Sequence, residues 1–185
     1  MAGTSGGSRK APDPDVRKVF VIHGRDLRLR DGLFDFLRAV DLRPLEWTSL
    51  IDDLGHGAPF IGQVLDHAFE TARAVIALFT PDDLAFLRPE LRLAKEELYE
   101  TEPTGQARPN VLFEAGMAMG RKPDSTILVE IGSLRPFSDI SGRHIIRLSN
   151  DVARRQDLIN RLRRCGCPAD TSGTAWITSG DFSVT

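Results

Sequence analysis

The segment from Arg108 to Met117 contains the side chain best suited to chemistry, a single carboxylate among apolar neighbours. Pro109 and Asn110 indicate the start of a helix, because proline lacks an amide hydrogen and asparagine caps free amide groups. Glu114 then lies near the positive end of the helix dipole, which favours an ionised carboxylate. We therefore take Glu114 as the candidate catalytic residue. The alternative is that it only complements the helix dipole.

Further polar residues follow two apolar runs that predict strands. His23-Gly24-Arg25-Asp26 comes directly after Lys18–Ile22, and Thr80-Pro81-Asp82-Asp83 comes directly after Ala74–Phe79. Such residues at strand ends are candidates for binding a substrate. The candidate substrate-binding residues are His23, Gly24, Arg25, Asp26, Trp47, Thr80, Asp82, Asp83 and Asn110.

Several of these residues also suit a purely structural role. Arg25 and Asp26 could simply begin the first helix, and Asp82 could cap a turn after Pro81. Trp47 could stack on a base or pack at the edge of the sheet. Both roles stay open for each residue.

The elements that would position these side chains alternate between strand and helix patterns. Unbroken apolar runs at Lys18–Ile22, Ala74–Phe79 and Thr126–Val129 predict strands buried on both faces, as parallel sheets require. Leu42–Trp47, which contains a proline, and His144–Leu148, which mixes polar and apolar residues, predict edge strands. The pattern predicts an α/β domain with a flavodoxin-like, five-stranded, mostly parallel sheet and helices on both faces.

Helical spacing of apolar residues recurs between these strands. It predicts helices over Leu29–Val40, Ile61–Ala72 and about Asp151–Arg164, and a further helix over Pro89–Tyr99 whose Leu91, Ala94 and Leu98 face inwards. The arginines of the last helix are expected on a solvated face. They are Arg154, Arg155, Arg161, Arg163 and Arg164.

In a sheet of this order, ligands bind beyond the carboxyl ends of the strands, where the winding reverses. That point lies between the first and third strands, so the polar segments after them should converge with the Glu114 helix. The loop Thr48–Phe60 follows the second strand over the same end of the sheet. Its glycines and lack of apolar periodicity predict a mobile segment, a lid or a contact surface.

Composition excludes several classes of protein. The 185 residues include 24 Lys and Arg and 26 Asp and Glu, so the net charge of -2 favours neither nucleic acid nor an anionic membrane as a partner. No apolar run approaches the roughly 20 residues of a membrane span. The N-terminal residues lack the apolar core of a secretory signal, which predicts a cytoplasmic protein. We expect a disordered leader at 1–16, one domain at 17–168, and a tail at 169–185 with enough apolar surface to dock on the domain.

Familiar catalytic motifs are missing from the sequence. It contains no Gly-x-Gly-x-x-Gly after the first strand, no Gly-x-x-x-x-Gly-Lys-Ser/Thr and no Gly-x-Ser-x-Gly, which argues against hydride transfer, phosphoryl transfer and serine hydrolysis. A phosphorylated receiver domain would need acidic residues at the end of the first strand and a lysine at the end of a later one, but the first strand ends in His23-Gly24-Arg25 and the fourth in Glu130-Ile131-Gly132. Cys165 and Cys167 have no neighbouring His or Cys to complete a zinc site, so no metal is expected.

Four separated blocks of the sequence resemble a known family. They are Val19–Asp26, Leu78–Asp83, Arg108–Gly116 and Phe137–Gly142. In this order, within Arg17 to Gly166, they resemble the bacterial TIR-like proteins described as predicted nucleotide-binding proteins, which are related to the TIR effectors of cyclic-nucleotide-triggered antiphage systems.

This resemblance implies a TIR fold, NAD+ as substrate with no cofactor, and Glu114 as the catalytic residue. It also implies self-association through Thr48–Phe60, and activation by a cyclic-nucleotide trigger or a sensor on another chain. The expected function is an NAD+ glycohydrolase acting as an antiphage effector. Its product would be ADP-ribose if water captures the ribose, or a cyclic form if another atom of the same molecule does. The alternative is a non-catalytic TIR assembly or nucleotide-sensing module.

Overall fold

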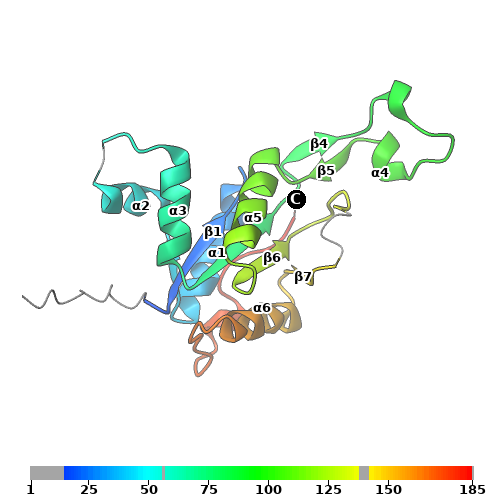
Figure 1. Ribbon diagram of the computed structural model, residues 1–185. Helices are drawn as coiled ribbons and strands as arrows, with labels where there is room; N and C mark the ends of the chain where they lie inside the picture. Colours follow the sequence, from blue (N-terminus) through cyan, green and yellow to red (C-terminus); the bar gives the residue numbers. More distant parts are fainter. Residues whose placement is uncertain (1–14, 56, 138–141, 185) are drawn as a thin grey trace, which may run out of the picture.

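A five-stranded parallel sheet forms the centre of the computed structural model, which describes residues 15–55, 57–137 and 142–184 (Figure 1). All four neighbouring strand pairs are parallel. In spatial order the strands are β2 (Arg43–Leu45), β1 (Lys18–Ile22), β3 (Ala74–Phe79), β6 (Thr126–Glu130) and β7 (Ile145–Arg147). The predicted flavodoxin-like order and both predicted edge strands are confirmed. Of the predicted leader, residues 1–14 lie outside the described residues.

Helices cover both faces of this sheet (Figure 1). The faces are separated by the alternation of side chains along each strand, since Val19 and Val21 belong to one apolar cluster and Phe20 and Ile22 to the other. The first cluster includes α1 (Leu27–Ala39) and α6 (Val152–Arg164). The second includes α2 (Trp47–Leu54), α3 (Ile61–Thr71) and α5 (Pro109–Arg121).

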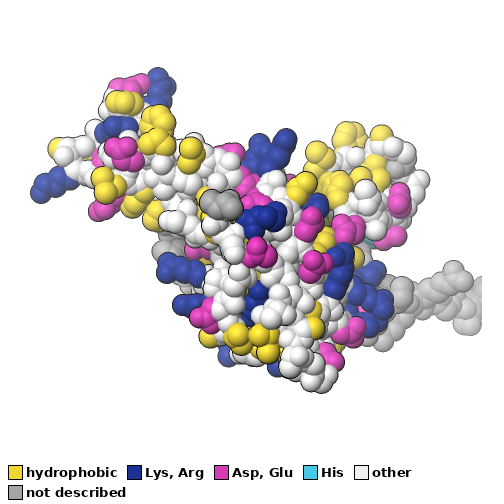
Figure 2. Space-filling model, turned by 180° about the vertical axis from the view of Figure 1, so that it is seen from behind, with side chains coloured by type: hydrophobic (Ala, Val, Ile, Leu, Met, Phe, Trp, Pro, Cys, Tyr) yellow, Lys and Arg dark blue, Asp and Glu magenta, His cyan; other side chains and the backbone are white. Residues whose placement is uncertain are grey.

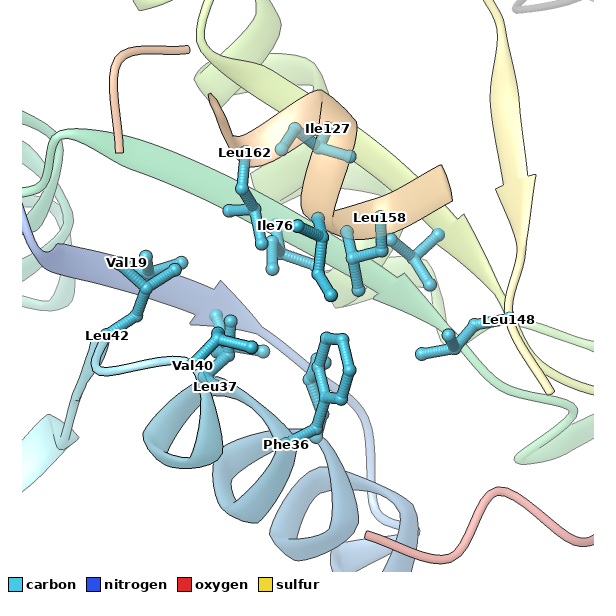
Figure 3. Packing of buried hydrophobic residues seen from close by; sticks show 14 of the residues in the cluster. Val19, Phe36, Leu37, Val40, Leu42, Ile76, Ile127, Leu148, Leu158 and Leu162 are labelled. Atoms are coloured by element: carbon cyan, nitrogen blue, oxygen red, sulfur yellow. The ribbon is translucent and has the colours of Figure 1, made fainter. Parts of the chain in front are cut away.

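Figure 3 shows how the first cluster is packed. Phe36 and Leu37 of α1 and Leu158 and Leu162 of α6 point toward the sheet residue Ile76, and all five side chains have no exposed surface. Interiors packed in this way hold strands and helices in one arrangement, because any change of volume is felt. The carboxyl ends of β1 and β3 are therefore fixed relative to each other.

The connection between β3 and α5 differs from the prediction. Instead of a helix over Pro89–Tyr99, the chain forms a hairpin with short helical turns. Its elements are β4 (Asp83–Ala85), the turn η1 (Pro89–Leu91), α4 (Leu98–Thr101) and β5 (Thr104–Gln106), and β4 pairs with β5 in antiparallel fashion. Leu91 and Leu98, predicted to face inwards, are 59% and 77% exposed. The prediction was wrong because these leucines have no core beside them to enter.

The segment after β2 is also more regular than predicted. Trp47 begins α2 rather than ending the strand, so much of the predicted mobile loop Thr48–Phe60 is helical. Leu50 of α2 is fully buried, and His67 Nε2 of α3 lies 3.7 Å from a carboxylate oxygen of Asp53. α2 is therefore anchored to α3 by one apolar and one polar contact. Residue 56 lies outside the described residues.

The C-terminal part of the chain packs along α1. Trp176 is 9% exposed and Phe182 is 2% exposed, and the Phe182 ring meets the Phe36 ring edge to face at 6.1 Å. Val184 reaches the sheet, where a Cβ added to Gly132 would lie 3.2 Å from it. The segment 176–184 thus runs to the same end of the sheet as the polar loops after β1 and β3.

One arginine predicted on the solvated face of α6 is buried. Arg155 is 2% exposed and holds the C-terminal segment, because its guanidinium donates to the backbone oxygens of Trp176, Ser179 and Gly180 and to Asn150 Oδ1. Its charge also lies 4.7 Å from the centre of the Phe182 ring. The sequence prediction failed here because helical position alone does not show that a later segment covers the residue.

Candidate functional site at the carboxyl ends of the strands

Asp82 ties the loop after β1 to the loop after β3. One of its carboxylate oxygens accepts a hydrogen bond from the backbone amide of Arg25, and the other accepts from Thr80 Oγ1 at 2.5 Å. A Cβ added to Gly24 would lie 1.9 Å from Asp82 Oδ2, so only glycine allows this approach. The structure therefore brings together four of the predicted site residues, Gly24, Arg25, Thr80 and Asp82.

Asp26 occupies the N-cap position of α1. Its carboxylate accepts a hydrogen bond from the backbone amide of Leu29 at 3.0 Å, as expected for an aspartate at a helix start. The Arg25 side chain beside it is exposed, whereas its backbone amide is held by Asp82. Of these two neighbours, Arg25 thus has the side chain that is open to a ligand.

His23 and Trp47 line a small pocket of about 160 Å³ between the ends of β1 and β2. His23 is half-buried, and its Nδ1 lies 2.9 Å from the carbonyl oxygen of Gly24. Burial lowers the pKa of the His23 imidazole below its ordinary value, although the Gly24 carbonyl partly opposes this shift. Trp47 is 38% exposed. A neutral imidazole and an indole face thus border a pocket that is suited to a flat ring.

Asp83 and Arg108 connect the hairpin to the start of α5. The Asp83 carboxylate lies 3.7 Å from Nε of Arg108, too far for a hydrogen bond. That nitrogen is buried and has no hydrogen-bond partner among the described residues. Arg108 was not among the predicted site residues, although its charge lies at a helix N-terminus, where the dipole disfavours a cation.

The start of α5 differs from the prediction in one respect. Arg108, not Asn110, occupies the N-cap position, and its side chain makes no capping hydrogen bond. Asn110 is the second residue of the helix and is exposed. The predicted cap was wrong because Pro109 is itself helical, as proline often is in a first turn. Asn110 therefore points a free amide into solvent near the site.

Glu114 lies on the flank of α5 that faces α3. Its neighbours Val111, Ala115 and Ala118 are buried against the sheet. Arg121 follows Glu114 by two helical turns, on the same face, and its guanidinium lies 3.0 Å from Asp66 of α3. Glu114 therefore lies on the α3 side of α5, toward the end where α3 begins.

The Glu114 carboxylate is half-buried and has no hydrogen bond or ion pair to any residue in 15–55, 57–137 or 142–184. Burial raises the pKa of this carboxyl above its ordinary value. We expected the helix dipole to keep it ionised. The dipole does not lower the pKa, because Glu114 is the sixth residue of α5, beyond the first turn where the dipole acts, so burial dominates.

Because its pKa is raised, an ionised Glu114 lowers the free energy of unfolding at neutral pH. Below the ordinary glutamate pKa of 4.5, both the folded and unfolded states are protonated at this site and the cost is absent. As the pH rises through the raised pKa, the unfolded state loses its proton first and the wild type loses stability. We expect Glu114→Gln to be more stable than wild type near neutral pH and similar to it under acid conditions.

Urea denaturation of both proteins from about pH 4 to about pH 8 measures this difference. Glu70→Gln, which changes an exposed carboxylate of the neighbouring helix, is the control and should show little change. A stability difference between Glu114→Gln and wild type that does not depend on pH would show that the Glu114 pKa is not raised.

The described residues contain no group of three or more His, Cys, Asp or Glu side chains placed to hold a metal ion. Cys165 and Cys167 are free thiols, and both are buried. Burial raises the pKa of Cys167 to about 11, so this thiol stays protonated and unreactive at neutral pH. The polar groups at the site are carboxylates, arginines, backbone amides, the His23 imidazole, the Thr80 hydroxyl and the Asn110 amide.

Comparison with known protein families gives a match that covers most of the chain. A family described as "CAP12/Pycsar effector protein, TIR domain" matches residues 18–150, which contain all five strands of the sheet and every candidate site residue. No curated protein matches the chain. Among the helices of the described residues, none is long and apolar enough to cross a membrane.

Proposed function

This chain belongs to the family of TIR domains found in CAP12/Pycsar effector proteins, and on that premise we propose that it cleaves the nicotinamide–ribose bond of NAD+. The observation that carries the proposal is the Glu114 carboxylate, half-buried on the side of α5 that faces α3 and unpaired among the described residues. An unpaired carboxylate that destabilises the fold is typical of a functional site rather than a structural one.

The chemistry requires little more than one carboxylate. Nicotinamide leaves as a neutral group, so no general acid is needed, and the difficulty is the positive charge that develops on the ribose ring. A carboxylate near the anomeric carbon stabilises that charge by electrostatics, by a covalent intermediate or by holding the ribose hydroxyls. In its ionised form Glu114 would supply this negative charge, and partial burial would strengthen the interaction.

Other residues would hold the rest of the dinucleotide. Arg25 and Arg108 are the candidates for the pyrophosphate, since the first has an exposed side chain and the second has a buried nitrogen without a hydrogen-bond partner among the described residues. Trp47 would stack on a base beside His23. Asp83 and Asn110 would contact ribose hydroxyls. Asp82 and Gly24 would act indirectly, by fixing the loop that carries Arg25.

We further propose that the activity serves antiphage defence and is switched on by assembly, in response to a cyclic nucleotide or a sensor on another chain. The segment Thr48–Phe60 and the adjoining start of α3 support self-association. Phe60 and Ile61 are 80% and 67% exposed, which is unusual for large apolar side chains on a monomer. A neighbouring copy that covers them would also cover the side of α5 on which Glu114 lies.

The test is incubation of the purified chain with NAD+ and with its fluorescent etheno analogue, in dilute solution, under crowding and when fused to an oligomerising partner. We expect nicotinamide release that increases with assembly. If no condition gives turnover but NAD+ still raises the melting temperature, the chain is instead a non-catalytic assembly or nucleotide-sensing module. If NAD+ neither turns over nor changes the melting temperature, both functions are rejected.

A further inference from the structure

The last described residues, 178–184, here called the strap, pack directly against α1. A Cβ added to Gly32 of α1 would lie 2.8 Å from the backbone oxygen of Asp181. A Cβ added to Gly180 would overlap the backbone oxygen of Gly32, and Gly180 has a φ of 75°, which favours glycine. The strap therefore contacts α1 backbone to backbone, in addition to the contact of the Phe182 ring.

Arg28, the second residue of α1, connects the strap to the loop after β1. Its Nη2 donates to the backbone oxygen of Ser183 at 2.6 Å, and its Nη1 lies 3.8 Å from the Asp181 carboxylate. The same guanidinium lies 3.8 Å from the carboxylate of Asp26, the N-cap residue of α1, which directly follows Arg25. One side chain thus contacts both the strap and the end of a substrate-binding loop.

Val184 brings the strap to the loop after β3. A Cβ added to Gly132, just after β6, would lie 3.2 Å from Val184 and 3.4 Å from Pro81, so both side chains border the bare backbone of this glycine. Pro81 directly precedes Asp82, whose carboxylate accepts a hydrogen bond from the backbone amide of Arg25. Figure 1 shows the red C-terminal segment running to this end of the sheet. The strap therefore reaches both substrate-binding loops.

We propose that the strap positions these two loops, with Arg28 and Val184 as the positioning residues. Residues 23–26 and 80–82 lie outside helices and strands, so contacts with a fixed neighbour limit their motion. Without the strap, the loops would hold a substrate less well, whereas Glu114 lies on α5, which these contacts do not involve. The inference rests on the proposed function for the identity of the substrate, but the effect on the loops does not.

Gly180→Ala tests the proposal, because the added Cβ would overlap the Gly32 oxygen and displace the strap from α1. Amide hydrogen exchange, measured without any nucleotide, is expected to become at least about tenfold faster in the strap and in residues 23–26 and 80–82. Exchange in α3 and α5 should stay as in wild type, which distinguishes lost positioning from a general loss of stability. Gly173→Ala is the matched control, since nothing lies within 4 Å of a Cβ added there, and it should exchange like wild type.

Arg28→Ala is the second variant, and it removes a side chain that is 43% exposed. On the face seen in Figure 2, dark blue and magenta side chains are intermingled over the body of the domain. The loss of one arginine should therefore change local contacts more than the overall electrostatic field. We expect faster exchange in the same segments as in Gly180→Ala, with smaller increases. If Gly180→Ala does not fold, as judged by circular dichroism, Arg28→Ala alone decides the outcome.

Turnover of NAD+ gives a separate measurement. Both variants are expected to raise KM by roughly threefold to tenfold and to keep kcat within about twofold of wild type, because the strap acts on binding loops and not on Glu114. Faster exchange confined to the strap, faster exchange throughout the domain, or a fall in kcat with KM unchanged would each overturn the proposal. A wild type that does not cleave NAD+ would contradict the proposed function, and the exchange pattern would then decide the positioning role by itself.

Discussion

Glu114→Gln is expected to lower kcat for NAD+ cleavage by roughly 10² to 10³-fold and to leave KM nearly unchanged. Glutamine keeps the shape of glutamate and removes its charge. The lost interaction is one that forms only as the ribose becomes cationic, so substrate affinity should survive. Nicotinamide release in single-turnover and steady-state assays, at equal states of assembly, measures both constants.

The same charge predicts the pH dependence of the wild type. Glu114 must be ionised to stabilise a cation, so activity should fall as the pH decreases through the raised pKa. The loss should therefore begin at a higher pH than an ordinary glutamate would give. Glu70→Gln should keep the wild-type rate and profile, because that carboxylate is exposed on α3. Glu114→Gln turnover at the wild-type rate would remove Glu114 from the mechanism.

The strands were the most predictable part of the fold. Lys18–Ile22 and Ala74–Phe79 begin and end as predicted, because a strand covered by helices on both faces must be apolar along its whole length. The order of the sheet followed from the alternation of strands and helices. Here the local pattern agrees with the tertiary environment, so the sequence alone was sufficient to predict these strands and their order.

The hairpin from residue 83 to residue 106 shows where prediction from apolar spacing fails. Leu91, Ala94 and Leu98 have the spacing of an inward-facing helical stripe, but the spacing indicates only that they share a face. It does not indicate that a core exists beside that face. In the structure the hairpin projects from the domain, starting at β4, and Arg92 stabilises it by donating hydrogen bonds to backbone oxygens. Contacts of this type between distant backbone groups have no pattern in the sequence.

The candidate site was predicted in its composition but not in its internal contacts. The convergence of the loops after β1 and β3 followed from the topology of the sheet, and the contact of Asp82 with Gly24 and Arg25 confirms it. The direction of the Glu114 pKa shift was not predictable, because the shift depends on burial, which only tertiary structure determines.

Arg155→Ala is expected to lower the free energy of unfolding by about 3 kcal/mol. The substitution leaves the carbonyl oxygens of Ser179 and Gly180 without the Arg155 donor, and it leaves a cavity beside the Phe36 and Phe182 rings. Urea denaturation measures the loss. Arg154→Ala is the matched control and should cost less than about 0.5 kcal/mol, because that side chain is exposed and makes one loose ion pair.

A lysine at position 155 separates the effect of the positive charge on stability from the effect of the guanidinium geometry. Arg155→Lys keeps the cation but has a single nitrogen, which cannot reach four acceptors on three sides. Its stability should therefore fall between those of Arg155→Ala and wild type, and faster amide exchange should be confined to residues 176–184 and the start of α1. The change should stay local, because two other hydrogen bonds also hold that segment. Arg28 donates to the backbone oxygen of Ser183, and the Asn150 side-chain amide donates to the Asp181 carboxylate. An Arg155→Ala protein as stable as Arg154→Ala would mean that apolar packing of Trp176 and Phe182 alone secures the C-terminal segment.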